Sequence, residues 1–184
     1  MYSFEIRYMT GIIPTNCDNF FVMTGGPGVG KTTLLDELEK RNFHYMPEIA
    51  RQLIKEQIAI GGDALPWKNM ELYKQIMLER WVASYKLAND ERVGITFFDR
   101  GILDTFCYAR LIDSPITKEM NDVAHRYRYN KKVFILPPWL EIYETDTERK
   151  QTWEEAVLTY EIMADTYEKY GYELIQVPQT TVEQ

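Results

Sequence analysis

A glycine-rich stretch that ends in a lysine and a threonine carries the clearest chemical signal in the chain. Residues 25–32 read GGPGVGKT, which fits the phosphate-binding pattern G-x-x-x-x-G-K-[ST]. In such a loop, backbone N–H groups curl around phosphates, Lys31 reaches the β- and γ-phosphates, and the Thr32 hydroxyl ligates Mg²⁺. The residues expected to hold the nucleotide are Gly25, Gly26, Pro27, Gly28, Val29, Gly30, Lys31, Thr32 and Thr33. ATP and Mg²⁺ are therefore the predicted cofactors.

The segments that flank this stretch support the nucleotide interpretation over a simple glycine-rich turn. An apolar run at residues 20–23 precedes it and is typical of a buried strand. After it, Leu34, Leu35 and Leu38 form an apolar stripe at helical spacing. The loop thus leads into the N-terminus of a helix, where anions bind well.

An acid and an arginine follow a second apolar run, at residues 94–98. Ligands of parallel α/β sheets lie beyond the carboxyl ends of the strands, so Asp99 is expected to hold the Mg²⁺ shell in the manner of a Walker-B aspartate. The alternative is that Asp99 caps the next helix. Arg100 stands where an ATPase often places a water-activating glutamate, and this favours phosphoryl transfer over hydrolysis.

A glutamate and a second arginine follow the run at residues 43–46. Glu48 is predicted to accept the proton of an acceptor hydroxyl or to orient the acceptor. Arg51, one helical turn further on, would steady substrate or phosphate through bidentate hydrogen bonds. The substrate-binding residues expected are thus Glu48, Arg51 and Arg100, and the alternative for the first two is a surface salt pair.

A charged connection near residues 140–152 is expected to act as a lid. Arg149 would there stabilise the charge of the transferring phosphoryl group, although most charge runs are merely solvated. The predicted catalytic set is therefore Lys31, Glu48, Asp99, Arg100 and Arg149, with Thr32 and Asp99 as Mg²⁺ ligands.

Alternating strand and helix patterns must position these residues. Strands are predicted near residues 20–23, 43–46, 94–98, 133–136 and 173–177, with helices between them. Residues 69–87 place Met70, Tyr73, Met77 and Trp81 at helical spacing, and Thr152 with Glu155 forms a capping-box pattern that predicts the start of another long helix. This alternation indicates an α/β, three-layer P-loop NTPase fold: a five-stranded parallel sheet, ordered 2-3-1-4-5, with helices on both faces. Residues 19–184 are expected to form the domain, and residues 1–18 an N-terminal extension without an assigned role.

Composition excludes several other functions. The net charge of −7 and the lack of a basic arm argue against nucleic-acid binding. No long apolar stretch indicates a membrane span or a secretory signal. Cys17 and Cys107 show neither disulfide-framework nor metal-ligand spacing, so a cytoplasmic protein is expected. The expected partner is a small-molecule acceptor, and the oligomeric state stays open.

Four segments in this order resemble a known family. TGGPGVGKTTLL, MPEIARQLI, FFDRG and TDTERKQTWEEA look like the small AAA-type P-loop ATPase-domain family. The same order is similar to the ribosylnicotinamide kinase domain of NadR proteins and, more distantly, to deoxynucleoside and thymidylate kinases. The resemblance implies the roles given above for Glu48, Asp99, Arg100 and Arg149. The chain departs from deoxynucleoside kinases in having Asp99 for their glutamate and Gly101 for their serine.

Together these features predict a P-loop kinase that transfers the γ-phosphoryl of ATP to a nucleoside- or nucleotide-like hydroxyl. One alternative is an ATPase, which would need a water-activating residue beside Asp99. Another is a non-catalytic nucleotide-sensing module. GTP is not favoured, because no N-K-x-D motif is present: Asn130-Lys131 is followed by Lys132-Val133.

Overall fold

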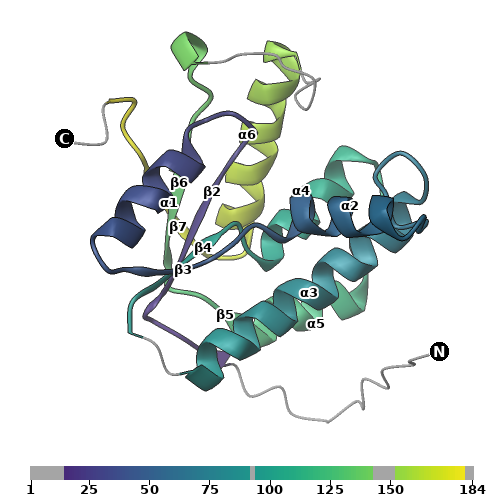
Figure 1. The fold of residues 1–184 in the computed structure, drawn as a ribbon, viewed down its shortest axis with the longest axis horizontal. Helices are drawn as coiled ribbons and strands as arrows, with labels where there is room; N and C mark the ends of the chain where they lie inside the picture. The colour runs from purple at the N-terminus through teal and green to yellow at the C-terminus, as the bar shows by residue number, and fades with distance from the viewer. Residues whose placement is uncertain (1–14, 92–93, 143–151, 181–184) are drawn as a thin grey trace.

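Short apolar runs form a central parallel sheet. The computed structural model describes residues 15–91, 94–142 and 152–180. Five strands form the sheet in the order β3-β4-β2-β6-β7, which is the 2-3-1-4-5 arrangement expected for the predicted strands (Figure 1). The strands are β2 Phe20–Gly25, β3 His44–Met46, β4 Thr96–Asp99, β6 Lys132–Leu136 and β7 Glu173–Gln176. All four pairings are parallel, so the carboxyl ends of the strands meet at one edge.

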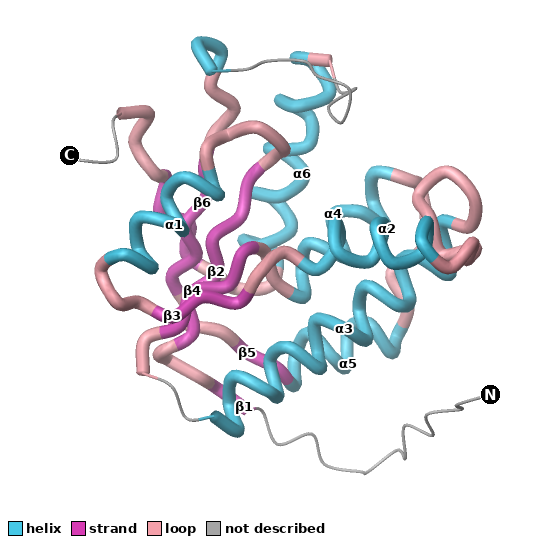
Figure 2. The backbone as a smooth tube through the Cα atoms, in the orientation of Figure 1, coloured by secondary structure: helices cyan, strands magenta, loops and turns pink. Residues whose placement is uncertain are grey.

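Helices lie on both faces of this sheet, as the alternating pattern predicts (Figure 2). Helix α1 contacts β2, β3 and β4 on one face, and α6 contacts β2. Helix α4 packs against both α3 and α6. The helices are α1 Lys31–Lys40, α2 Ile49–Ala59, α3 Met70–Glu91, α4 Ile102–Leu111, α5 Lys118–Arg126 and α6 Trp153–Lys169, with a 3₁₀ turn, η1, at Leu140–Ile142.

The sheet separates the apolar residues into two main groups, because side chains alternate along a strand. Phe20 and Val22 of β2 pack with Phe98 and the helical residues Trp81 and Tyr85. Met23 packs on the other face with residues of α1 and its preceding loop. The larger part of the core thus lies on the face that α3 and α4 cover.

Helix α3 and helix α6 begin close to their predicted positions. Tyr73, Met77 and Trp81 of the predicted stripe are buried, whereas Met70 is 47% exposed because α3 begins at this residue. The capping box predicted before α6 is confirmed: Thr152 Oγ1 accepts from the N–H of Glu155, and the Glu155 carboxylate accepts from the N–H of Thr152. The sequence pattern therefore locates both helices well.

A second small sheet was not expected. Strand β1, Thr15–Asn16, pairs in parallel with β5, Tyr127–Arg128, and the Tyr85 hydroxyl lies 2.8 Å and 2.7 Å from the carbonyl oxygens of Thr15 and Arg128. Residues 15 and 16, which the sequence assigns to the extension, thus contact the domain. Residues 1–14 lie outside the described residues. Among the helices described, none is long and apolar enough to cross a membrane.

Candidate functional site

The glycine-rich loop joins the end of β2 to the start of α1. Gly25, Gly28 and Gly30 adopt φ values of 145°, 75° and 86°, in the region that favours glycine. A Cβ on Gly25 would lie 2.7 Å from the carbonyl oxygen of Leu136. Glycine is thus required where β2 passes closest to β6. The first N–H groups of α1 have no partner within the helix, so this loop can receive an anion.

Lys31 lies at the base of the loop and is only 7% exposed. Its Nζ donates to the carbonyl oxygens of Gly25 at 3.1 Å and Gly26 at 2.9 Å. Burial, and then the charge of Arg100, lower the pKa of Lys31 from 10.5 to about 8, although Asp99, Glu48 and Asp104 act in the opposite direction. Lys31 and Arg100 are thus two interacting positive charges, which suit a polyanion.

Asp99 ends β4 beside the loop strand, in register with Met23. Its side chain is buried, and within the described ranges its Oδ1 has no hydrogen-bond partner. Burial raises the pKa of Asp99 above the ordinary value, against the attraction of Lys31 and Arg100. A buried carboxylate oxygen without a partner fits a cation ligand. The alternative capping role does not hold, because Gly101 is the N-cap of α4 and its N–H donates to Asp104.

Arg100 turns back from the tip of β4 toward α2. Its backbone has φ of 74°, a left-handed conformation that is uncommon outside glycine, and functional sites are enriched in such residues. Its Nε donates to Glu48 Oε1 at 3.0 Å and its Nη1 to Asp104 Oδ1 at 3.1 Å. Burial would lower the pKa of Arg100, but Glu48, Asp104 and Asp99 raise it above the ordinary value. The guanidinium therefore stays charged.

Glu48 precedes α2 and contacts this guanidinium more closely than it contacts Arg51, its partner in the alternative salt pair. The Arg51 Nε lies 4.0 Å from Glu48 Oε2, a longer contact than that with Arg100, and the Arg51 side chain is 59% exposed. Burial would raise the pKa of Glu48, but the charges of Arg100, Lys31 and Arg51 together hold it below the ordinary value. Glu48 is therefore a carboxylate at neutral pH.

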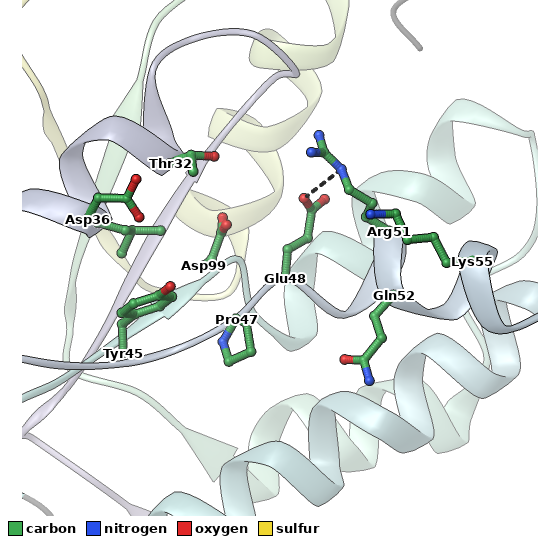
Figure 3. Close-up of a pocket in the computed structure, with 10 residues that line it drawn as sticks. Thr32, Asp36, Tyr45, Pro47, Glu48, Arg51, Gln52, Lys55 and Asp99 are labelled. Atoms are coloured by element: carbon green, nitrogen blue, oxygen red, sulfur yellow. Dashed lines mark ion pairs between the residues drawn. The ribbon is translucent and has the colours of Figure 1, made fainter. Parts of the chain in front are cut away.

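A cavity of about 360 Å³ opens at this edge of the sheet (Figure 3). The predicted metal ligands Thr32 and Asp99 line it together with the acceptor-side residues Glu48 and Arg51, and Arg51 joins Glu48 in the ion pair drawn (Figure 3). The remaining lining residues are Leu35, Asp36, Tyr45, Pro47, Gln52 and Lys55. The cavity is large enough for a small molecule beside the phosphate-binding loop.

The structure does not describe two of the predicted features, Arg149 and the lid, but it adds Asp104 to the site. Arg149 and residues 143–151 of the expected lid lie outside the described residues, whereas η1 and Thr152 flank them. Asp104, which the sequence analysis did not select, contacts Arg100 and is 6% exposed. Its position four residues after Arg100, in the first turn of a helix, was the available signal. Cys107 is buried in α4, and burial raises the pKa of its thiol, as fits a core residue.

The fold and the loop define a P-loop NTPase of kinase-like architecture. Residues 20–184 match the family described as "AAA domain", and the chain belongs to this family. A search among curated proteins found no match.

Three solved structures illustrate the likeness of fold. Deoxyadenosine kinase from M. mycoides with bound dATP is 15% identical, with a TM-score of 0.58, over 89% of this chain and 93% of the kinase. NadR protein in complex with NR is 20% identical, with a TM-score of 0.63, over 85% of this chain and 45% of NadR. NadR protein in complex with NAD and AMP-PNP is 22% identical, with a TM-score of 0.56, over 87% of this chain and 44% of NadR. This chain therefore spans less than half of the NadR protein.

Proposed function

We propose that this protein is a small-molecule kinase that transfers the γ-phosphoryl of ATP to a hydroxyl of a nucleoside- or nucleotide-like acceptor. One observation carries the proposal: the Glu48–Arg100 ion pair, with N–O distance 3.0 Å, joins the two strand tips next to the phosphate-binding loop. It brings a carboxylate and a cation to the edge of the sheet where ligands of parallel α/β folds bind.

The loop and its lysine bind the triphosphate in this proposal. Lys31 and the N-terminal amides of α1 neutralise the β- and γ-phosphates. Thr32 and Asp99 hold Mg²⁺, which supplies further neutralisation of the phosphate charge when bound. Arg100 donates to the oxygens of the γ-phosphoryl, and Arg149 is proposed to do so from the connection before α6. ATP is favoured over GTP, because no N-K-x-D motif is present in the sequence.

Glu48 acts on the acceptor. The acceptor oxygen forms a bond to the γ-phosphorus while the bond from that phosphorus to the β,γ-bridging oxygen breaks, and ADP leaves with the bonding electrons. Glu48 orients the hydroxyl and accepts its proton, which then passes to solvent. Because the pKa of Glu48 is lowered, its orienting role comes before its role as a base. Arg51, an exposed residue that lines the cavity, steadies the acceptor.

The acceptor class is supported by likeness of fold. One similar structure is a deoxyadenosine kinase and another is NadR in complex with NR. The wall of the cavity combines Tyr45 and Leu35 with the polar side chain of Gln52, a mixture that suits a small polar molecule with an apolar face. We place the protein in the cytoplasm, where the free cysteines Cys17 and Cys107 would stay reduced.

The test measures ADP formation from Mg·ATP with and without a panel of nucleosides, nucleotides, sugars and amino-alcohol antibiotics. Acceptor-stimulated ADP formation that is lost in Lys31→Ala and Glu48→Gln supports a kinase. Lys40→Ala, at the exposed end of the same helix α1, should behave as the wild type. Acceptor-independent turnover that persists in Glu48→Gln would instead identify an ATPase. Tight ATP binding without turnover would favour a sensing module.

A further inference from the structure

Asp104 joins four parts of the molecule through its buried carboxylate. Its Oδ2 accepts from the N–H of Gly101 at 2.8 Å and from the Tyr167 hydroxyl at 2.6 Å. Its Oδ1 accepts from the Thr24 hydroxyl at 2.7 Å and from Arg100 Nη1 at 3.1 Å. One oxygen thus caps α4 and contacts α6, while the other faces the loop strand and the guanidinium.

We propose that Asp104 is the positioning residue that holds the Arg100 guanidinium toward the γ-phosphoryl. This inference rests on the proposed function, in which Arg100 contacts that group. Asp104 does not touch substrate, and it acts only through Arg100.

Hydrogen bonds hold both the backbone and the guanidinium of Arg100 in place. Its N–H donates to the carbonyl oxygen of Met23 at 2.9 Å, which fixes the backbone at the tip of the sheet in a left-handed conformation. Glu48, which precedes α2, accepts a hydrogen bond from Nε, and Asp104 in α4 accepts one from Nη1. A guanidinium carries five N–H donors in a fixed fork, so two anchored donors orient the remaining three. Within the described residues those three have no hydrogen-bond partner, so in this proposal they are available to phosphate oxygens.

Helix capping alone does not account for Asp104. A capping carboxylate needs one oxygen for the backbone N–H of the cap, and Oδ2 meets this need. The second oxygen is 2.7 Å from the hydroxyl of Thr24, the residue immediately before Gly25 of the loop. Asp104 therefore ties the position of Arg100 to the strand that carries the phosphate-binding loop.

A double-mutant cycle separates the positioning role from a structural one. Asp104→Asn is expected to lower kcat for acceptor-dependent ADP formation about 10- to 100-fold, with KM for the acceptor changed less than about threefold. In the Arg100→Ala background the same substitution should lower kcat no further, while its effect on the melting temperature persists. Tyr167→Phe, which removes one of the two donors to Oδ2 and none to Oδ1, is the matched control and should lower the melting temperature with kcat within about twofold of wild type.

Nucleotide affinity gives a second readout that needs no acceptor. Arg100 on the γ-phosphoryl makes Mg·ATP bind more tightly than Mg·ADP, and Asp104→Asn should reduce this ratio about as far as Arg100→Ala does. Thr24→Val, which removes the hydroxyl donor to Oδ1 but keeps the carboxylate and its contact with Arg100, should reduce the ratio by a smaller factor and serves if Asp104→Asn does not fold.

The outcomes distinguish this inference from the proposed kinase activity. If Asp104→Asn reduces the ATP-to-ADP affinity ratio while the wild-type protein shows no turnover with any acceptor, the role of Asp104 is supported and the kinase activity is removed. Wild-type turnover with an unchanged ratio and unchanged kcat in Asp104→Asn removes the role of Asp104 and leaves the kinase. A third outcome is that Asp104→Asn lowers kcat equally in the wild-type and Arg100→Ala backgrounds. This result would overturn the positioning role of Asp104, because Asp104 would then act independently of Arg100.

Discussion

The phosphate-binding loop takes its shape from consecutive residues, whereas the cluster at the tip of β4 is assembled from distant parts of the chain. The loop runs from Gly25 to Lys31 and depends on glycine backbone conformations. In the cluster, Arg100 meets Glu48 across 52 positions, and Asp104 meets Thr24 across 80. The comparison teaches that nucleotide binding depends on local backbone, and that the expected chemistry with an acceptor depends on tertiary placement of charged side chains.

Lys31→Ala should have the largest effect, because it removes the one side chain through which the loop itself neutralises phosphate charge. We expect acceptor-dependent ADP formation to fall at least about 1000-fold, which corresponds to about 4 kcal/mol of transition-state stabilisation. The fold should persist, since within the described part of the chain the hydrogen bonds of Lys31 Nζ go to the loop carbonyl oxygens of Gly25 and Gly26. Steady-state kinetics and thermal unfolding measure the two effects, and a collapse of the fold would contradict the assignment of Lys31 to function.

Glu48→Gln should distinguish most clearly between the nucleotide binding of the loop and the acceptor chemistry of the cluster at the tip of β4. The substitution keeps the shape of the side chain but removes the charge that faces Arg100, so the acceptor-dependent rate should fall about 100- to 1000-fold. The affinity for Mg·ATP should change less than about threefold, because the loop is untouched and the glutamine side-chain oxygen can still accept from Arg100 Nε. Isothermal titration and kinetics measure these quantities. Glu56→Gln on the same helix α2, whose carboxylate pairs with Arg80, is the control and should leave both near wild type.

The same contrast explains how much the sequence predicts. The loop, the five main strands and the start of α6 follow from local patterns, since each is encoded within a few residues. Strands β1 and β5 were missed because two residues have no detectable period, and their pairing depends on the Tyr85 hydroxyl from α3. Local reasoning also coupled Glu48 to Arg51, one turn away, although the shorter ion pair joins Glu48 to Arg100.

The charge state of Lys31 gives a prediction that tests the buried environment of the loop. Below about pH 8 Lys31 is protonated in both the folded and the unfolded protein. Between about pH 8 and 10.5 the unfolded chain still holds a proton that the folded protein has released, because burial lowers the pKa of Lys31 from 10.5 to about 8. The unfolded state then binds more protons, so the free energy of unfolding rises with pH.

Urea unfolding of the wild type and of Lys31→Met between pH 7 and pH 10 measures this effect. Relative to Lys31→Met, the wild type should gain about 2–3 kcal/mol of stability by pH 10, since one pKa unit is about 1.36 kcal/mol. Other titrating groups are common to both proteins and cancel in the difference. A difference that stays constant over this pH range would show that Lys31 is not desolvated in the folded protein.

Gly101→Ala should have the smallest effect and tests how closely the cluster is packed. A Cβ at Gly101 would lie 3.0 Å from Val22 Cγ2 and 3.3 Å from the Tyr167 hydroxyl oxygen, and crowding of this kind destabilises by about 1–2 kcal/mol. Gly94→Ala is the control, because among the described residues no heavy atom beyond its own chain neighbours lies within 4 Å of its added Cβ. This crowding gives a physical reason why the chain carries glycine where deoxynucleoside kinases carry serine. If urea unfolding shows Gly101→Ala to be as stable as Gly94→Ala, then the contacts around Val22 relax easily and the strand tip is less rigid than the loop beside it.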